Sequence, residues 1–245
     1  MILDRPPRRS ATLTAAGFAT VAVVHLGAQL ADAGAVSRVS QWLLMPLLAA
    51  TMALATTAPR SRLVRTTLLA LAFSWLGDTA PSLFDGDAAF LVMIAFFLLA
   101  QLAYVVAFLP YAAASVATRP AVVMYLAAVA GLVVACAPGA GVLLVPALIY
   151  GLCLGTTAVL STGLGRVAGT GGALFLLSDA MIALGAFAEW FTPPAEGFWV
   201  MLTYIAGQTL LVWGVLATDK AESAPERLRP PDGEFGAGAT TSSGR

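Results

Sequence analysis

The chain has 245 residues, of which 59% are hydrophobic and only 11% are charged. A soluble domain carries about 25% charged residues to cover its surface, so this chain, with a mean hydropathy of +0.87, must have lipid as its solvent. The 13 basic and 13 acidic residues balance and form no basic patch, which argues against a nucleic-acid partner. The composition therefore predicts an integral membrane protein.

Apolar stretches of about 17–22 residues recur along the chain, and each is long enough to cross a hydrocarbon core about 30 Å thick. Short connections rich in Pro, Gly and charged residues separate them. We therefore expect an all-α, polytopic membrane protein with eight transmembrane helices. The stretches cover roughly residues 12–31, 39–57, 63–81, 89–111, 120–137, 141–160, 170–188 and 197–217.

The basic residues predict the orientation of this membrane domain, residues 12–217. With eight spans and a cytoplasmic N-terminus, every Lys and Arg except Arg38 falls on the inner side, as the positive-inside rule requires. Residues 1–11 are then a basic cytoplasmic N-terminus. Residues 218–245, rich in Pro, Gly and Ser, are predicted to be a disordered cytoplasmic tail. In a bacterium such a protein would lie in the inner membrane.

An internal duplication is a further expectation. The run from Leu43 to Pro46 resembles the run from Leu143 to Pro146, offset by 100 residues, and Asp78 and Asp179 are 101 residues apart. Four spans per half give both halves the same orientation, so the repeats would be parallel. Chance matching between apolar segments is the alternative explanation.

Asp78 and Asp179 are the most probable functional centre. A carboxylate inside the membrane is costly and is a functional hypothesis by default. Each aspartate follows an arginine of the predicted inner side by 13 residues, which places both about 20 Å from the cytoplasmic edge at a rise of about 1.5 Å per residue. A parallel duplication would bring them towards each other. The alternative is that each merely caps or hydrogen-bonds a neighbouring helix, above all Asp78, because Pro81 predicts a helix end.

Other polar residues in the predicted spans are candidates to support the aspartates or to bind substrate, although hydrogen bonding between helices is an equally good interpretation. They are Ser74, Gln101, Tyr104, Ser178, Tyr204 and Gln208. With one histidine and two cysteines the chain cannot build a conventional zinc site, and it carries no phosphate-binding loop or dinucleotide fingerprint. We therefore expect carboxylate chemistry without a metal or another cofactor.

Several of these segments resemble the YhhN-like lysoplasmalogenase family of integral membrane proteins. The resemblance covers roughly residues 12–217, and its most specific parts are the two aspartate motifs. They are the segments Ser74–Asp78, Phe96–Tyr104 and Phe175–Leu184, together with Leu43–Leu48 and the pair Tyr204 and Gln208.

The resemblance implies eight spans and hydrolysis of the vinyl-ether bond of lysoplasmalogens taken from the bilayer. The products are a fatty aldehyde and a glycerophospho-base, and Asp78 and Asp179 would be the catalytic pair. The chain departs from the family pattern at Gln41, at Gln101 and at Gly185, where members often have Lys, His and Asn. These departures leave the aspartates in place but alter the polar residues around them.

A proton-sharing aspartate pair suits this chemistry. Protonation of the β-carbon opens a vinyl ether and leaves an oxocarbenium ion for water to attack, and a carboxylic acid keeps its proton near neutral pH when it is withdrawn from water beside a second carboxylate. The pattern does not assign which aspartate is the acid. The alternative function is a non-catalytic lipid carrier or a small proton-coupled transporter, in which the aspartates would relay protons.

Overall fold

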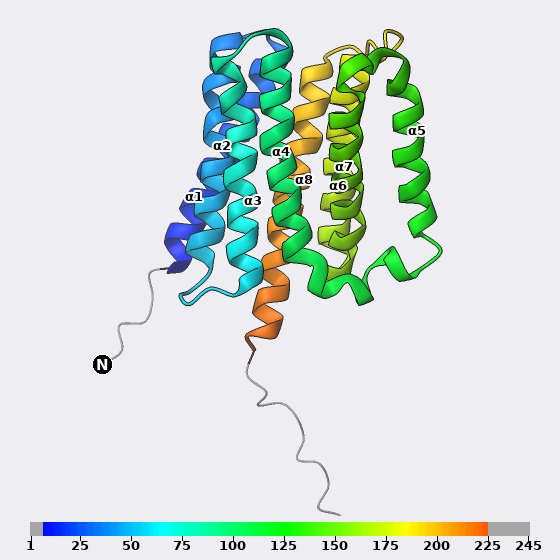
Figure 1. The fold of residues 1–245 in the computed structure, drawn as a ribbon. Coiled ribbons are helices and arrows are strands. Elements are labelled where there is room, and N and C mark those ends of the chain that lie inside the picture. The colour runs from blue at the N-terminus through cyan, green and yellow to red at the C-terminus, as the bar shows by residue number, and fades with distance from the viewer. Residues whose placement is uncertain (1–6, 225–245) are drawn as a thin grey trace, which may run out of the picture.

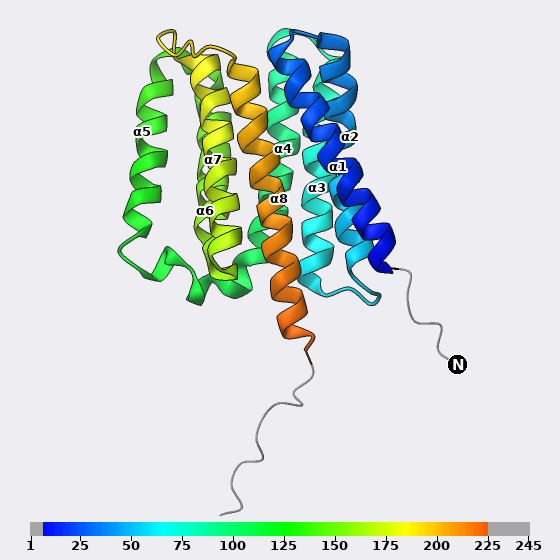
Figure 2. The same ribbon diagram turned by 180° about the vertical axis from the view of Figure 1, so that it is seen from behind.

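The computed structural model describes residues 7–224 and consists, over that range, of α-helices joined by short 3-10 turns and loops (Figures 1 and 2). The expectation of an all-α protein is confirmed. The eight α-helices are α1 (Pro7–Leu30), α2 (Gly34–Ala55), α3 (Arg62–Thr79), α4 (Gly86–Phe108), α5 (Val122–Ala140), α6 (Leu144–Ser161), α7 (Arg166–Phe187) and α8 (Glu196–Glu222).

Each apolar stretch identified in the sequence corresponds to one of these helices. The largest differences are at the ends: α1 and α2 begin earlier than predicted and α8 ends later, at Glu222 instead of residue 217. Polar residues at the ends of a helix can continue its backbone hydrogen bonds without belonging to the apolar stretch, so hydropathy underestimates helix length. The predicted tail from residue 225 onward lies outside the described residues.

Six segments between residues 9 and 222 are long and apolar enough to cross a membrane. One of them, Val122–Leu164, has 43 residues and contains both α5 and α6. Helix α3 is not among the six, because Arg62, Arg65 and Asp78 place three charges in 18 residues. The chain is thus a multi-pass helical membrane protein with at least these apolar helices; the count of eight spans stays a prediction.

The helices stand side by side with their axes roughly aligned (Figures 1 and 2). In both views α1, α2 and α3 lie to one side, α5, α6 and α7 to the other, and α4 and α8 occupy the centre. The start of α1 and the end of α8 lie at the same end of the bundle, which we call the basic end because Arg60, Arg119 and Arg166 lie there in or beside the connections. Arg38, near the start of α2, lies at the opposite end, which we call the outer end after the predicted orientation.

The close approach of α7 and α8 depends on glycine. A side chain at Gly171 would stand 2.7 Å from the backbone nitrogen of Leu211 and 2.8 Å from the carbonyl oxygen of Gly207. Conversely, a side chain at Gly207 would stand 2.9 Å from the backbone nitrogen of Phe175. Small residues allow helix backbones to come this close in a membrane, so this seam sets the position of Tyr204 and Gln208 on α8.

Candidate active site

Asp78 lies one residue before the end of α3, and the 3-10 turn Ala80–Leu83 follows. The helix end predicted from Pro81 is therefore present. The half-buried carboxylate of Asp78 accepts a hydrogen bond of 2.9 Å from the Tyr204 hydroxyl of α8 and one of 3.3 Å from the Gln41 amide of α2. It also lines a polar cavity of about 400 Å³ at the outer end of the bundle.

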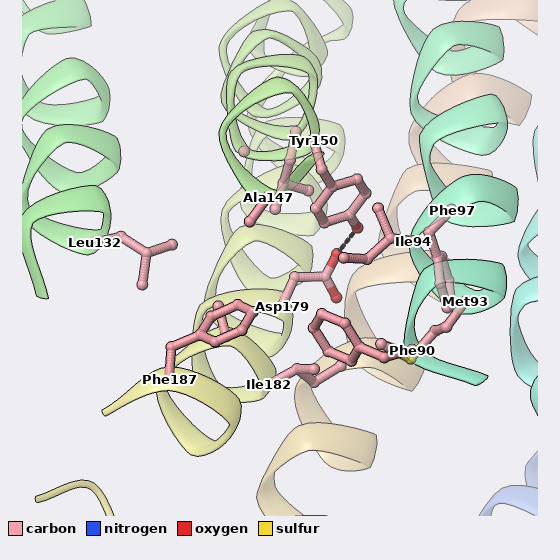
Figure 3. Close-up of a pocket in the computed structure, with 13 residues that line it drawn as sticks. Phe90, Met93, Ile94, Phe97, Leu132, Ala147, Tyr150, Asp179, Ile182 and Phe187 are labelled. Atoms are coloured by element: carbon pink, nitrogen blue, oxygen red, sulfur yellow. Dashed lines mark hydrogen bonds between the residues drawn. The ribbon is translucent and has the colours of Figure 1, made fainter. Parts of the chain in front are cut away.

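Asp179 lies in the interior of α7 and is 8% exposed. Its carboxylate accepts a short hydrogen bond from the Tyr150 hydroxyl of α6, drawn as a dashed line in Figure 3. The carboxylate faces a different cavity of about 60 Å³, whose other walls are almost entirely apolar. About 10–15 Å³ suffices for one water molecule, so the cavity has room for several non-hydrogen atoms. Phe90, Met93, Ile94 and Phe97 of α4 form the wall opposite Asp179 (Figure 3).

Phe97 contacts the surroundings of both aspartates. Its ring lines the Asp179 cavity and packs edge-on against Tyr204, the partner of Asp78, with 5.9 Å between the ring centroids. On its other side the ring lies where a side chain at Gly77 would stand, 2.7 Å from the nearest ring carbon. A glycine beside Asp78 therefore lets α4 pack this ring directly against α3.

The two carboxyl groups thus belong to two tyrosine–aspartate pairs. Within residues 7–224 no hydrogen bond joins Asp78 to Asp179. Each carboxylate has a tyrosine donor of its own, from α8 in one case and from α6 in the other. The proton shared between the two carboxyl groups stays a prediction.

Three of the predicted supporting residues form one fully buried network next to Asp78. The Tyr104 hydroxyl donates a hydrogen bond of 2.5 Å to the Gln208 side-chain oxygen, and the Gln208 amide donates one of 3.1 Å to the Ser74 hydroxyl. All three side chains are 0% exposed. They join α3, α4 and α8, and none of the three lines either of the two cavities.

Gln101 and Ser178 lie elsewhere. Ser178 donates a hydrogen bond of 3.0 Å to the carbonyl oxygen of Val200, which is a link between α7 and α8. Gln101 is fully buried and neither polar atom of its amide has a well-formed hydrogen bond with any described residue, although the amide lies close enough to act on the Tyr150 hydroxyl. A buried amide left without partners is costly, so a water molecule or a substrate oxygen between Gln101 and Tyr150 would be stabilised there.

Two residues in contact with the aspartates were not among the predicted site residues. The Tyr150 hydroxyl donates a hydrogen bond to Asp179, and the side-chain amide of Gln41 donates one to Asp78. A tyrosine within an apolar helix is a signal that could have been used, because a buried phenol needs a hydrogen-bond partner. Gln41 is one of the departures from the family pattern, and the structure shows that this departure touches the carboxylate itself. At Gly185, another departure, the Glu196 carboxylate fills the space that a side chain would need.

The described residues contain no group of three His, Cys, Asp or Glu side chains that could hold a metal ion. Cys136 on α5 and Cys153 on α6 are both free thiols. The polar groups that line the two cavities beside the aspartates include the Tyr150 hydroxyl in one cavity and the Gln41 amide in the other.

Phenylalanine in place of Tyr150 tests the Asp179 pair. The substitution keeps the ring in the cavity wall and removes only the hydroxyl that donates to the carboxylate. A hydrogen bond to a charged group contributes about 1.5–3 kcal/mol, so we expect the Tm to fall by several degrees and turnover, measured well below the Tm of the variant, to fall by about tenfold to a hundredfold. Tyr125→Phe, on α5, is the matched control. Equal turnover in Tyr150→Phe and the wild type would contradict a role for this hydroxyl.

Fold and site together define a multi-pass helical membrane protein that keeps two tyrosine-bound aspartates among its apolar helices. The sequence model of the YhhN family matches residues 36–215, and the chain therefore belongs to the YhhN family. The match includes both aspartates and every predicted supporting residue, and it confirms the resemblance seen in the sequence. No curated protein and no solved structure matches the chain.

Proposed function

We propose that this protein is a membrane hydrolase that cleaves the vinyl-ether bond of lysoplasmalogen-like ether lysolipids. The observation that carries the proposal is the Tyr150–Asp179 pair, a carboxyl group that faces an apolar cavity inside the bundle. An apolar cavity with few polar groups suits the alkenyl part of a lipid. A carboxylic acid within it is the group that can donate a proton to carbon.

The reaction needs one proton donor, one water molecule and a negative charge. A carboxylic acid protonates the β-carbon of the vinyl ether, and the resulting oxocarbenium ion is stabilised by the other, ionised aspartate. Water adds to the cation and loses a proton, giving a hemiacetal. The hemiacetal breaks down into a fatty aldehyde and the free hydroxyl of the glycerophospho-base. Gln101 and Tyr150 stand where they could hold the water.

The proposal includes eight transmembrane helices with both termini in the cytoplasm. Helix α3 would cross the membrane although it carries three charges, because Arg62 and Arg65 lie in its first turn at the basic end and Asp78 accepts hydrogen bonds from two other helices. The gathering of Arg60, Arg119 and Arg166 at the same end supports this orientation.

A transporter would need a polar path from one end of the bundle to the other. Towards the basic end, the centre of the bundle is instead filled by apolar side chains that are at most 3% exposed, among them Met52, Val64, Phe108, Leu211 and Val215. Both aspartates therefore lie on the outer side of a packed apolar layer. This favours a hydrolase with a closed pocket over proton-coupled transport.

The direct test is aldehyde release from a defined lysoplasmalogen by the purified protein in detergent or nanodiscs. We expect one equivalent of fatty aldehyde for each glycerophospho-base, and no release from the corresponding alkyl ether, which has no double bond to protonate. Failure to release aldehyde from any vinyl ether would overturn the proposal.

A larger residue at position 151 should block the apolar cavity. Gly151 lines the cavity, and a side chain added there meets nothing within 4 Å, so Gly151→Leu can be accommodated without a clash at its Cβ. Leucine is a better helix former than glycine, so the substitution should favour helix α6. We expect the KM for lysoplasmalogen to rise about tenfold or more without loss of thermal stability. Gly131→Leu on α5, which is equally unobstructed and lines neither cavity, should leave KM unchanged.

A further inference from the structure

The polar cavity at the outer end lies between α1, α2 and the end of α3 and shares no lining residue with the Asp179 cavity. Its volume of about 400 Å³ lies within the range of about 300–1,000 Å³ that is usual for small-molecule sites. Its walls differ from those of the apolar cavity in kind, because most of its lining residues are polar or charged. These are Gln29, Asp32, Ser37, Arg38, Gln41, Asp78 and Ser82.

Arg38 is the cation of this cavity and makes no ion pair or hydrogen bond with any residue between 7 and 224. It is also the one basic residue that the helix bounds place at the outer end of the described bundle. A guanidinium group presents a planar set of donors that matches the oxygens of a phosphate, often through two parallel hydrogen bonds. The side chain of Arg38 is exposed to solvent at this cavity, so its guanidinium can receive a phosphate from the water phase.

The same cavity carries negative charge and an aromatic ring. Asp32, in the connection between α1 and α2, and Trp42 of α2 both line it. A carboxylate and an indole ring are the groups that bind an ammonium or a quaternary ammonium group. The cavity thus carries both a positive and a negative side chain. A zwitterionic ligand can pair with both charges, whereas a simple anion can pair only with Arg38.

We propose that this cavity binds the zwitterionic phosphodiester headgroup of a lysophospholipid, with the phosphate at Arg38 and the amine at Asp32 and Trp42. The inference rests on the proposed function, since it names the headgroup of the same substrate. Asp78 belongs both to this cavity and to the reacting pair. A headgroup held here places the glycerol part of the lipid beside one of the two carboxyl groups.

The experiment is a binding measurement that needs no turnover. A 1-O-alkyl lysophosphatidylcholine, which has no vinyl ether to hydrolyse, is titrated into the purified protein in nanodiscs. We expect Arg38→Gln to weaken binding about tenfold or more, and Arg38→Lys to weaken it less because the charge is kept. Arg119→Gln, at the basic end, is the matched control and should bind as the wild type does.

Two further ligands identify the part of the headgroup that is bound. A 1-O-alkylglycerol, which has no phosphate, should bind equally to the wild type and to Arg38→Gln. Asp32→Asn should weaken binding of the choline lysolipid but not of the corresponding lysophosphatidate, which lacks the amine. Asparagine suits this position because Asp32 has a φ of +50°, a conformation in which Asn is common.

Two outcomes would overturn the headgroup site. One is an equal loss of alkylglycerol and lysolipid binding in Arg38→Gln. The other is binding of inorganic phosphate alone as tightly as the lysolipid, which would assign the site to free phosphate. The result is separable from hydrolysis: Arg38-dependent binding without aldehyde release would overturn the proposed function only, and aldehyde release without Arg38 dependence would overturn the headgroup site only.

Discussion

Asparagine in place of Asp179 should reduce aldehyde release from a lysoplasmalogen by about a hundredfold or more, and Asp78→Asn should do the same. Asparagine has nearly the same size and can still accept the hydrogen bond from Tyr150 or Tyr204, so the fold should be retained. It can neither donate a carboxylic proton nor carry a negative charge. A general acid or base contributes about 10²–10⁴-fold to the rate.

The double variant is informative because groups that act as a unit lose activity in a non-additive way. If the aspartates work together, Asp78→Asn combined with Asp179→Asn should be no slower than the worse single variant. Asp87→Asn, in the first turn of α4 at the outer end, is the control for a general effect of charge removal. Undiminished turnover in either single variant would rule out a catalytic pair.

Valine in place of Gly171 should destabilise the fold and separate α7 from α8. The new side chain would approach the Leu211 nitrogen and the Gly207 oxygen of α8 to 2.7 and 2.8 Å, and backbone atoms cannot move aside as a flexible side chain can. Overpacking costs about 1–3 kcal/mol, and each kcal/mol lowers the Tm of a protein of this size by about 2–4 °C. We expect a clear loss of Tm in detergent together with loss of turnover, because α8 carries Tyr204.

The matched control is Gly131→Val, which introduces the same residue type into helix α5 at a position with nothing within 4 Å. It should retain both Tm and turnover. A Tm in Gly171→Val equal to that of Gly131→Val would show that α7 and α8 can separate without cost, against the close packing described for this seam.

Much of the fold could be predicted from hydropathy, because a helix that crosses a lipid layer must satisfy its backbone hydrogen bonds internally and present apolar side chains outward. The positions of all eight helices follow from that requirement. The ends of α1, α2 and α8 do not, because residues such as Arg9, Arg38 and Lys220 continue a helix without being apolar. Helix α3 differs in the opposite way. Its charged residues lower its hydropathy, although it carries Asp78 and packs against the other helices of the site.

The aspartates could be predicted because a carboxyl group among apolar residues of a membrane span is costly and marks a functional site. Their hydrogen-bond partners could be predicted only in part. Tyr204 could be named from the family resemblance, whereas Tyr150 and Gln41 reach the carboxylates through the packing of α6 on α7 and of α2 on α3, and no spacing within one helix encodes such a contact. The approach of the Phe97 ring to α3 depends on Gly77, and an isolated glycine in a helix does not indicate which side chain will approach it.

The placement of the two cavities has a consequence for the fate of the products. One carboxyl group faces an apolar cavity inside the bundle and the other faces a polar cavity at its outer end. In the proposed reaction the bond that breaks is the one that links the chain to the headgroup, so cleavage leaves the aldehyde on the apolar side and the glycerophospho-base on the polar side. The two products would then partition into different phases, the aldehyde into the bilayer and the glycerophospho-base into water, and recombination of the two would be disfavoured by their separation alone.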